Sequence, residues 1–329
     1  MRSVTWGSYD ERDYGELIFI SEHMREVDRQ IQDAASHDLP VLITGETGVG
    51  KELVAVEIHR RSRRSSGPLL IQNMAEINEE LAASILFGHK KGSFTGAYED
   101  KRGLFQEADG GILVLDEITE TPITVQSTLL RAVERGRIRM VGDVKEIEVD
   151  VRVIATSNRD IQKAMREGRL RRDLYYRLSL MHIRIPPLRD RVEDIPLLAK
   201  YFIEVANERY GFNILGMEED VMEALKRRRW EGNVRELRNL MESLAIRKRE
   251  GWIRMEDLRG VLLGGEQQLP PGFNLREEIE RLKRGLIMMA LRETNGNISK
   301  AADMLGISRV GLKKMMERLK IRHTPSDER

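Results

Sequence analysis

The chain of 329 residues contains no cysteine, and this absence removes several classes of function. A disulfide scaffold, a cysteine-ligated zinc site, an iron–sulfur cluster and a catalytic thiol all require that residue. Long apolar runs are missing too, because the longest is Leu286–Leu291 and a membrane-spanning helix needs roughly 20 apolar residues. Residues 1–13 are polar and lack the apolar core of a signal peptide. We therefore expect a cytoplasmic protein that does not contact a membrane.

The chain also lacks an excess of either charge, because its 55 Lys and Arg nearly balance its 54 Asp and Glu, for a net charge of +1. The balance is uneven along the chain. Residues 275–329 hold 13 Lys and Arg against eight Asp and Glu, which leaves +5 on this end and −4 on the rest. A basic end attached to a mildly acidic body suits a protein whose C-terminal part binds nucleic acid.

Five short apolar runs alternate with helical patterns over about residues 17–187. Parallel strands need long crossover connections, usually helices, so this order predicts an α/β fold with a parallel sheet covered by helices on both faces. The runs are Val41–Thr44, Leu69–Gln72, Ile112–Leu115, Val151–Ala155 and Met181–Ile185.

The rest of the chain is expected to divide further. Residues 188–260 contain no strand-like run and predict a small helical bundle. Residues 261–274 are rich in Gly, Pro and Gln and predict a linker. Residues 275–329 predict an all-α domain, and residues 1–16 a short extension.

A glycine-rich stretch with the spacing G-x-x-x-x-G-K follows the first predicted strand. It comprises Gly45, Glu46, Thr47, Gly48, Val49, Gly50, Lys51 and Glu52. Between a strand and a helix, this spacing predicts a P-loop, whose backbone N–H groups point at phosphate oxygens. Lys51 would reach the β- and γ-phosphates, whereas Glu52 replaces the usual Ser or Thr that binds Mg²⁺. A glycine-rich turn without a ligand is the alternative.

Two acids, Asp116 and Glu117, end the third predicted strand. Ligands bind at the carboxyl ends of parallel strands, so Asp116 would hold Mg²⁺ and Glu117 would orient and deprotonate the attacking water. The alternative is a solvated acidic turn. No N-K-x-D motif for guanine is present, so ATP is favoured over GTP as the nucleotide.

One hexapeptide is far more specific than the P-loop: Gly92-Ser93-Phe94-Thr95-Gly96-Ala97. With its flanks it resembles the G-A-F-T-G-A loop of bacterial enhancer-binding proteins, the AAA+ ATPases that activate sigma-54 RNA polymerase. The resemblance covers about residues 17–260 and implies an AAA+ ATPase with a helical lid, in which Phe94 and Thr95 contact sigma-54. The alternative is that Phe94 packs against its own domain.

The resemblance also assigns roles to single residues. Asn73 matches a switch asparagine that positions Glu117, and Asn158 matches a sensor near the γ-phosphate. Arg171 and Arg177 match the segment of the arginine fingers, which act on a neighbouring subunit, so a ring, by resemblance a hexamer, is implied. Arg235 matches the sensor arginine of the lid. A capping asparagine and solvated arginines are the alternatives.

Several positions depart from the family pattern. Ser93 replaces Ala, Leu170 replaces Phe, and Glu231 replaces Pro. A second surface loop, Arg139–Asp143, ends with Asp143 where the family usually has Gly.

The C-terminal block predicts a helix-turn-helix. Two sets of apolar residues at i, i+3, i+4 and i+7 flank Gly306, namely Ile298, Ala301, Ala302 and Leu305, then Leu312, Met315, Met316 and Leu319. The segment resembles the Fis-type DNA-binding domain, which is dimeric, and the preceding helix, about residues 275–293, would supply the dimer contact. A basic dimerisation tail is the alternative. The expected DNA-binding residues are Ser308, Arg309, Lys313, Lys314 and Arg318.

Together these observations predict a transcription activator that binds enhancer DNA and uses ATP hydrolysis in a ring to remodel the sigma-54 RNA polymerase closed complex. Few residues precede the resemblance, so we expect no N-terminal regulatory domain and control by a partner protein in trans or by expression level. Two alternatives stay open: a DNA-binding regulator whose ATPase domain only oligomerises, and an AAA+ remodeller of other proteins.

Overall fold

A computed structural model describes residues 17–262 and, further on, residues 287, 288, 290, 291, 294, 297–307, 309–319 and 321. Two compact units divide the chain, residues 1–261 and 262–329. The predicted linker and the predicted helix over about 275–293 fall largely outside the described residues. Among those described, no helix is long and apolar enough to cross a membrane.

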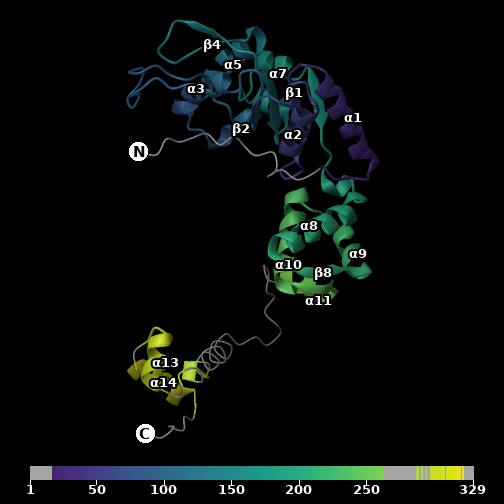
Figure 1. Ribbon diagram of the computed structural model, residues 1–329, viewed down its shortest axis with the longest axis vertical. Coiled ribbons are helices and arrows are strands. Elements are labelled where there is room, and N and C mark those ends of the chain that lie inside the picture. The colour runs from purple at the N-terminus through teal and green to yellow at the C-terminus, as the bar shows by residue number, and fades with distance from the viewer. Residues whose placement is uncertain are drawn as a thin grey trace. The chain divides into compact units, whose positions relative to one another are not determined.

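The first unit is built on a five-stranded parallel sheet in the order β2-β3-β6-β1-β7 (Figure 1). All five apolar runs form strands, and the predicted α/β fold is confirmed. The central strand β6 pairs with β1 through Val41 opposite Ile154, and β3 pairs with β2 through Asn73 opposite Asp116. The bounds are β1 Val41–Thr44, β2 Leu69–Asn73, β3 Ile112–Asp116, β6 Arg152–Ser157 and β7 Met181–Arg184.

Helices cover both faces of the sheet (Figure 1). Side chains alternate along a strand, so Ile112 and Val114 of β3 pack with α1 and α2, whereas Leu113 and Leu115 pack with the helices on the opposite face. The helices are α1 Glu22–Ser36, α2 Lys51–Arg61, α3 Glu79–Phe87, α4 Leu104–Glu107, α5 Ile123–Arg135, α6 Ile161–Arg166 and α7 Arg172–Leu178. A short hairpin, β4 Arg137–Arg139 and β5 Glu146–Glu148, follows α5.

The lid, here residues 188–262, contains α8 Asp194–Tyr210, α9 Glu219–Arg227, α10 Asn233–Lys248 and α11 Met255–Leu262 around a separate core. The prediction that this part holds no strand is wrong. β8 Asn213–Met217 and β9 Glu250–Ile253 pair in parallel. Each strand contains a glycine and an exposed apolar residue, Leu215 or Trp252, so neither gives an apolar run or a clean alternation.

A buried carboxylate ties the N-terminal end of the described chain to the lid. Asp194, fully buried at the start of α8, accepts hydrogen bonds from the backbone N–H groups of Ile20 (2.6 Å) and Ser21 (2.7 Å) and from the Ser21 hydroxyl (2.8 Å). Ser21 in turn caps α1. One carboxylate therefore fixes the start of α1 against α8.

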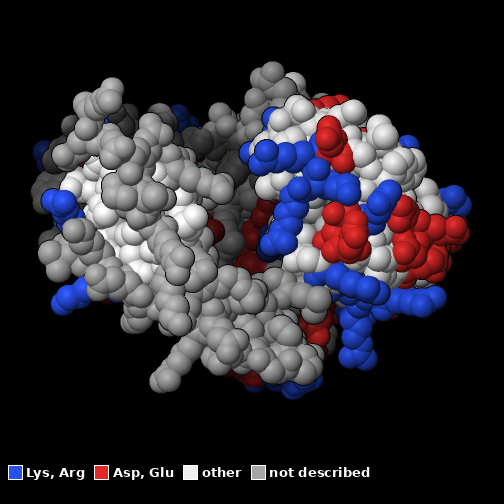
Figure 2. Space-filling view, turned by 90° about the horizontal axis from the view of Figure 1, so that it is seen from below, with Lys and Arg blue, Asp and Glu red and all other residues white. Residues whose placement is uncertain are grey.

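Charge on this unit is nearly balanced, with 40 Lys and Arg and 41 Asp and Glu over residues 17–262. On the face in Figure 2, basic and acidic side chains lie interleaved on the described surface rather than in zones of one sign.

The second unit forms the predicted helix-turn-helix. α13 Ile298–Met304 and α14 Arg309–Arg318 flank Gly306, which has a φ of 67°. The left-handed conformation at this turn favours glycine. The two predicted apolar sets meet in one core with Ile287, Ala290 and Leu291.

We expect Asp194→Ala to lower the free energy of unfolding by about 3 kcal/mol, because the two buried donors of Ser21 and the part-buried N–H of Ile20 lose their acceptor. Urea unfolding followed by circular dichroism measures the effect. Glu22→Ala is the control, since Glu22 forms only exposed ion pairs with Arg25 and Arg29 and its removal should change stability by less than about 0.5 kcal/mol. Equal losses for both variants would contradict the anchoring role of Asp194.

Candidate nucleotide site

The phosphate loop, residues 45–51, connects β1 to α2 at the carboxyl edge of the sheet. Gly48 and Gly50 have φ values of 79° and 106°, a region that glycine enters without strain. Gly50 caps α2, so the first N–H groups of the helix face the space that the loop encloses. The backbone therefore has the form of an anion site.

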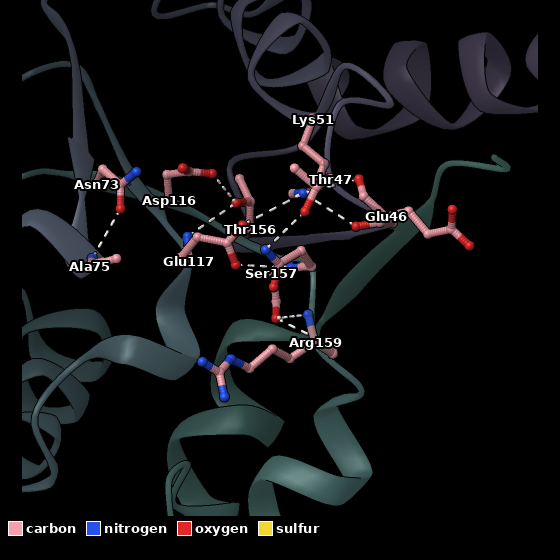
Figure 3. A network of polar contacts seen from close by, with 12 residues as sticks. Glu46, Thr47, Lys51, Asn73, Ala75, Asp116, Glu117, Thr156, Ser157 and Arg159 are labelled. Atoms are coloured by element: carbon pink, nitrogen blue, oxygen red, sulfur yellow. Dashed lines mark hydrogen bonds and ion pairs between the residues drawn. The ribbon is translucent and has the colours of Figure 1, made fainter. Parts of the chain in front are cut away.

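Lys51 is buried at the first position of α2. Its ammonium donates to the carbonyl oxygens of Gly45 (3.2 Å) and Glu46 (3.4 Å) and lies 3.7 Å from Oε1 of Glu117 (Figure 3). The loop thus holds its own cation, and the same cation faces the acidic end of β3.

Asp116 and Glu117 stand at the end of β3, as predicted. Asp116 is buried and accepts a hydrogen bond from the Thr156 hydroxyl, and the Thr156 oxygen accepts one from the N–H of Glu117 (3.3 Å). Glu117 has φ 55° and ψ 55°, a left-handed conformation that is uncommon outside glycine. This turn aims the Glu117 carboxylate back toward the loop rather than along the strand (Figure 3).

Asn158 joins the two halves of the site. Its N–H donates to Oε2 of Glu117 (3.0 Å), and its side-chain amide donates to the Thr47 hydroxyl of the phosphate loop (3.2 Å). The structure therefore brings Thr47, Lys51, Asp116, Glu117 and Asn158 together at one edge of the sheet.

Asn73, the predicted switch residue, ends β2 beside the acidic end of β3. It lies opposite Asp116 in register, but its side-chain oxygen accepts the N–H of Ala75 (2.9 Å) and so caps the short helix Met74–Glu76. Among the described residues, no hydrogen bond joins Asn73 to Glu117. The switch role stays a prediction.

The two predicted finger residues belong to the α7 segment, with Arg171 as the N-cap of the helix and Arg177 in its last turn. The exposed Arg171 forms a bidentate ion pair with Asp173, with a shortest distance of 2.8 Å. Arg177 is half-buried, and its Nε is buried without a hydrogen-bond partner among the described residues. Among the described residues neither arginine contacts Lys51, and a finger acts on a neighbouring subunit.

The lid reaches the phosphate loop through the first turn of α10. The Gly48 carbonyl accepts from the N–H groups of Val234 (3.0 Å) and Arg235 (3.2 Å). Arg235, the predicted lid sensor, is thereby placed beside the loop, although its side chain is exposed.

The sequence does not reveal three residues that hold the site: Arg189 and Asn233 at the junction of the loop with the lid, and Thr156 beside β3. Arg189 binds both carboxylate oxygens of Glu46, at 2.6 and 2.8 Å, and the buried Asn233 donates to Glu46 (3.2 Å) and to the Thr47 carbonyl (3.0 Å). The Arg189 guanidinium, more than any other group, lowers the pKa of Glu46 to about 2. Arg189 and Asn233 lie far from the loop in sequence, so no local motif predicts their contact with it. Thr156 could have been suspected, because it lies near the end of the strand next to β3.

The donors present fit a magnesium nucleotide. Mg²⁺ prefers oxygen ligands and is commonly held by one or two carboxylates together with substrate phosphates. Asp116 supplies a carboxylate at the mouth of the loop, and Glu52 places a second carboxylate on the first turn of α2.

The surface loop, Gly92–Ala97, projects from the same domain. The N–H of Gly92 donates to the Ala97 carbonyl (2.8 Å), which closes the loop. Phe94 is 36% exposed and packs edge-on against His89, with ring centroids 5.0 Å apart. Phe94 therefore packs against its own domain and also remains partly accessible to a partner.

The second loop, Arg139–Asp143, lies against the first. The N–H of Lys90 donates to the Val141 carbonyl (3.0 Å), and a Cβ added at Gly142 would lie 2.5 Å from the Cβ of Ser93. Asp143 accepts from the N–H groups of Val144 (2.7 Å) and Lys145 (3.1 Å), so it shapes its own turn.

In the helix-turn-helix, Arg309 and Lys314 lie on α14 and are exposed. Ser308 and the side chains of Lys313 and Arg318 lie outside what the structure describes.

The parallel sheet, the P-loop and the lid define the first unit as an AAA+ P-loop domain, joined in sequence to a helix-turn-helix. The sequence matches three families: Sigma-54 interaction domain over residues 17–184, AAA+ ATPase lid domain over 189–272, and Bacterial regulatory protein, Fis family, over 276–319. The chain therefore belongs to the sigma-54-dependent transcriptional activators.

Individual relatives agree. The chain is 40% identical to the nitric oxide reductase transcription regulator NorR2 of Cupriavidus necator, covering 93% of this chain and 63% of that protein. It is 42% identical to the response regulator protein PilR of Pseudomonas aeruginosa, covering 93% and 70%. The crystal structure of NtrX from Brucella abortus in complex with ADP superposes with a TM-score of 0.71 at 31% identity, covering 94% and 71%. The chain thus spans about two thirds of the length of these relatives.

We expect Gly48→Ala to destabilise the first unit more than Gly110→Ala. The two glycines have nearly the same φ, 79° and 78°, so both variants incur the left-handed penalty of about 1–2 kcal/mol. Only at position 48 would the new Cβ meet a backbone atom, the Gly232 carbonyl oxygen at 2.3 Å, whereas position 110 has nothing within 4 Å. The clash should add about 1–3 kcal/mol. Thermal unfolding without nucleotide measures it, and equal shifts would argue against close contact between loop and lid.

Proposed function

We propose that this protein is an ATP-driven transcription activator: it binds enhancer DNA, hydrolyses ATP in a ring and remodels the sigma-54 RNA polymerase closed complex. The observation that carries the proposal is the convergence of Lys51, Asp116, Glu117 and Asn158 on a P-loop in the same domain as the exposed surface loop. Membership of the sigma-54 activator family and the NtrX structures solved with ADP and ATP support it.

In this proposal the phosphate loop and Lys51 bind the β- and γ-phosphates of ATP, and Asp116 and Glu52 would hold Mg²⁺, which when bound would supply positive charge to neutralise the phosphates. Glu117 accepts a proton from the attacking water, and Asn158, bonded to both Glu117 and Thr47, keeps that carboxylate in line with the loop.

Completion of the site requires a second subunit. The Arg171 ion pair with Asp173 is exposed and could exchange its partner for the phosphates of a neighbour's nucleotide. Arg177, with a buried Nε lacking a partner among the described residues, is better suited to hold α7 than to reach outward. We therefore assign the finger to Arg171, in a homo-oligomeric ring.

We assign the contact that remodels the sigma-54 polymerase closed complex to the surface loop, Gly92–Ala97. It is hydrogen-bonded at its base to the second loop and carries Phe94 and Thr95 at its tip. The alternative, in which the ATPase domain serves only for oligomerisation, leaves both the aligned Glu117 and the half-exposed Phe94 without a role.

Two single variants test ATP hydrolysis and open-complex formation separately. We expect Glu117→Gln to bind ATP but to hydrolyse it at least about 100-fold more slowly, since the general base is lost. Thr95→Ala should hydrolyse ATP at the normal rate yet fail to support ATP-dependent open-complex formation by sigma-54 polymerase. Thr124→Ala, at an exposed position of α5 in the same domain, is the control for Thr95. If both main variants activated like the parent chain, the proposed mechanism would be wrong.

DNA binding is assigned to α14. We expect Lys314→Ala to weaken binding across DNA sequences and to reduce the slope of log K against log salt by about 1, as for one lost phosphate contact. A titration of binding against salt concentration measures this slope. Lys200→Ala, an exposed lysine of α8, should leave it unchanged. A protein that binds no DNA even at low salt would favour a remodeller of other proteins.

A further inference from the structure

The phosphate loop and the lid share a polar junction that extends beyond the nucleotide-facing side of the loop. Four consecutive loop residues, 46 to 49, each contact residues 188–235. Glu46 binds Arg189 and Asn233, the Thr47 carbonyl accepts from Asn233, the Gly48 carbonyl accepts from the start of α10, and the Val49 carbonyl accepts from the buried Arg191 (3.0 Å).

Asn233 is the centre of this junction. It is fully buried with a φ of 53°, and its side-chain oxygen accepts the N–H of Leu188 (2.8 Å) while its amide donates to Glu46 and Thr47. One side chain therefore links the first residue of the lid, the phosphate loop and the first turn of α10. A shift of α10 would pull on the loop at these contacts.

Glu46 adds the only charge among these loop residues. Its carboxylate faces away from the nucleotide-facing amides and accepts both guanidinium N–H groups of Arg189 (Figure 3 shows it at the edge of the site). Arg189 is the largest cause of the lowered pKa of Glu46, about 2, so the pair stays ionised at neutral pH. An anion in a phosphate-binding loop opposes phosphate unless it is neutralised, and Arg189 of the lid neutralises it.

We propose that Glu46, Arg189 and Asn233 form a positioning cluster that couples the placement of the lid to the affinity of the phosphate loop for nucleotide. The proposal rests on nucleotide binding at this loop. With the cluster intact, Asn233 fixes the backbone of the phosphate loop and Arg189 neutralises the charge of Glu46. When Arg189 is lost, the loop is both less constrained and more negative, and nucleotide affinity falls.

A double-mutant cycle tests the coupling on the full chain. Arg189→Ala should weaken binding of a fluorescent ADP analogue about fivefold, the value for about 1 kcal/mol, because Glu46 is left uncompensated. Glu46→Gln should change binding less, since the glutamine keeps an oxygen for Asn233 and carries no charge. The double variant should bind like Glu46→Gln alone, because without the carboxylate Arg189 has nothing to neutralise.

The matched control is a second lid ion pair, Arg254 with Glu218 (3.1 Å), which does not contact the phosphate loop. Arg254→Ala, Glu218→Gln and their combination should leave ADP affinity unchanged. Arg189→Lys keeps the charge but not the bidentate contact with Glu46, and it should retain most of the ADP affinity. That result would show that the loss in Arg189→Ala does not come from a folding defect.

A second readout distinguishes positioning from mere stability. At a fixed ADP concentration, the rise in unfolding temperature grows with the logarithm of 1 + [ADP]/Kd, so Arg189→Ala should shrink the ADP-induced shift even where the unfolding temperature without ADP is unchanged. Additive effects in the cycle, or unchanged ADP affinity with a lowered unfolding temperature, would overturn the proposal. Because equilibrium ADP binding is measured, an inactive ATPase would overturn the proposed function without deciding this coupling.

Discussion

The hydrogen bonds from the first turn of α10 to the Gly48 carbonyl are the contact on which the nucleotide site depends. A P-loop presents its N–H groups inward, so its carbonyls must point outward and find donors elsewhere. Here the lid supplies those donors to three successive carbonyls, through Asn233, α10 and Arg191. The loop keeps its shape because a second subdomain satisfies its reverse side, and Gly48 has no Cβ so that the Gly232 backbone can come this close.

The same sheet edge arranges the chemistry on the other side of the loop. Thr156 and Asn158, at the end of the central strand β6, orient Asp116 and Glu117 from the neighbouring β3 and connect them to Thr47. The left-handed turn at Glu117 is supported by the hydrogen bond from its N–H to Thr156. The acidic pair is therefore held by neighbours of the sheet, whereas the loop is held by the lid.

The parts of the fold that burial dictates were predictable. Strands buried on both faces give uninterrupted apolar runs, so β1, β3 and β6 could be located from sequence, and the motif residues 45–51 and 116–117 follow directly from them. β8 and β9 were not predictable, because two short, half-exposed strands with Gly216 and Gly251 carry no periodic signal. The ion pair of Glu46 with Arg189 joins residues 143 apart in sequence and depends on how the lid folds back, which no local pattern encodes. Asn73 shows another limit, since a motif match implies a role toward Glu117, whereas the cap that its side chain forms on the short helix Met74–Glu76 is local and leaves that role a prediction.

The contact of Ser93 with Gly142 constrains how this chain could evolve. The space between the two loops admits either a side chain at position 93 or one at position 142, because a Cβ at 142 would lie 2.5 Å from the one already present. The two positions therefore share a fixed volume, and any substitution that enlarges one selects for a small residue at the other. Alanine, the usual residue of the family at position 93, carries the same Cβ as Ser93, so Gly142 accommodates either residue from nearly fifty positions away, and a side chain at position 142 would displace the loop that carries Phe94.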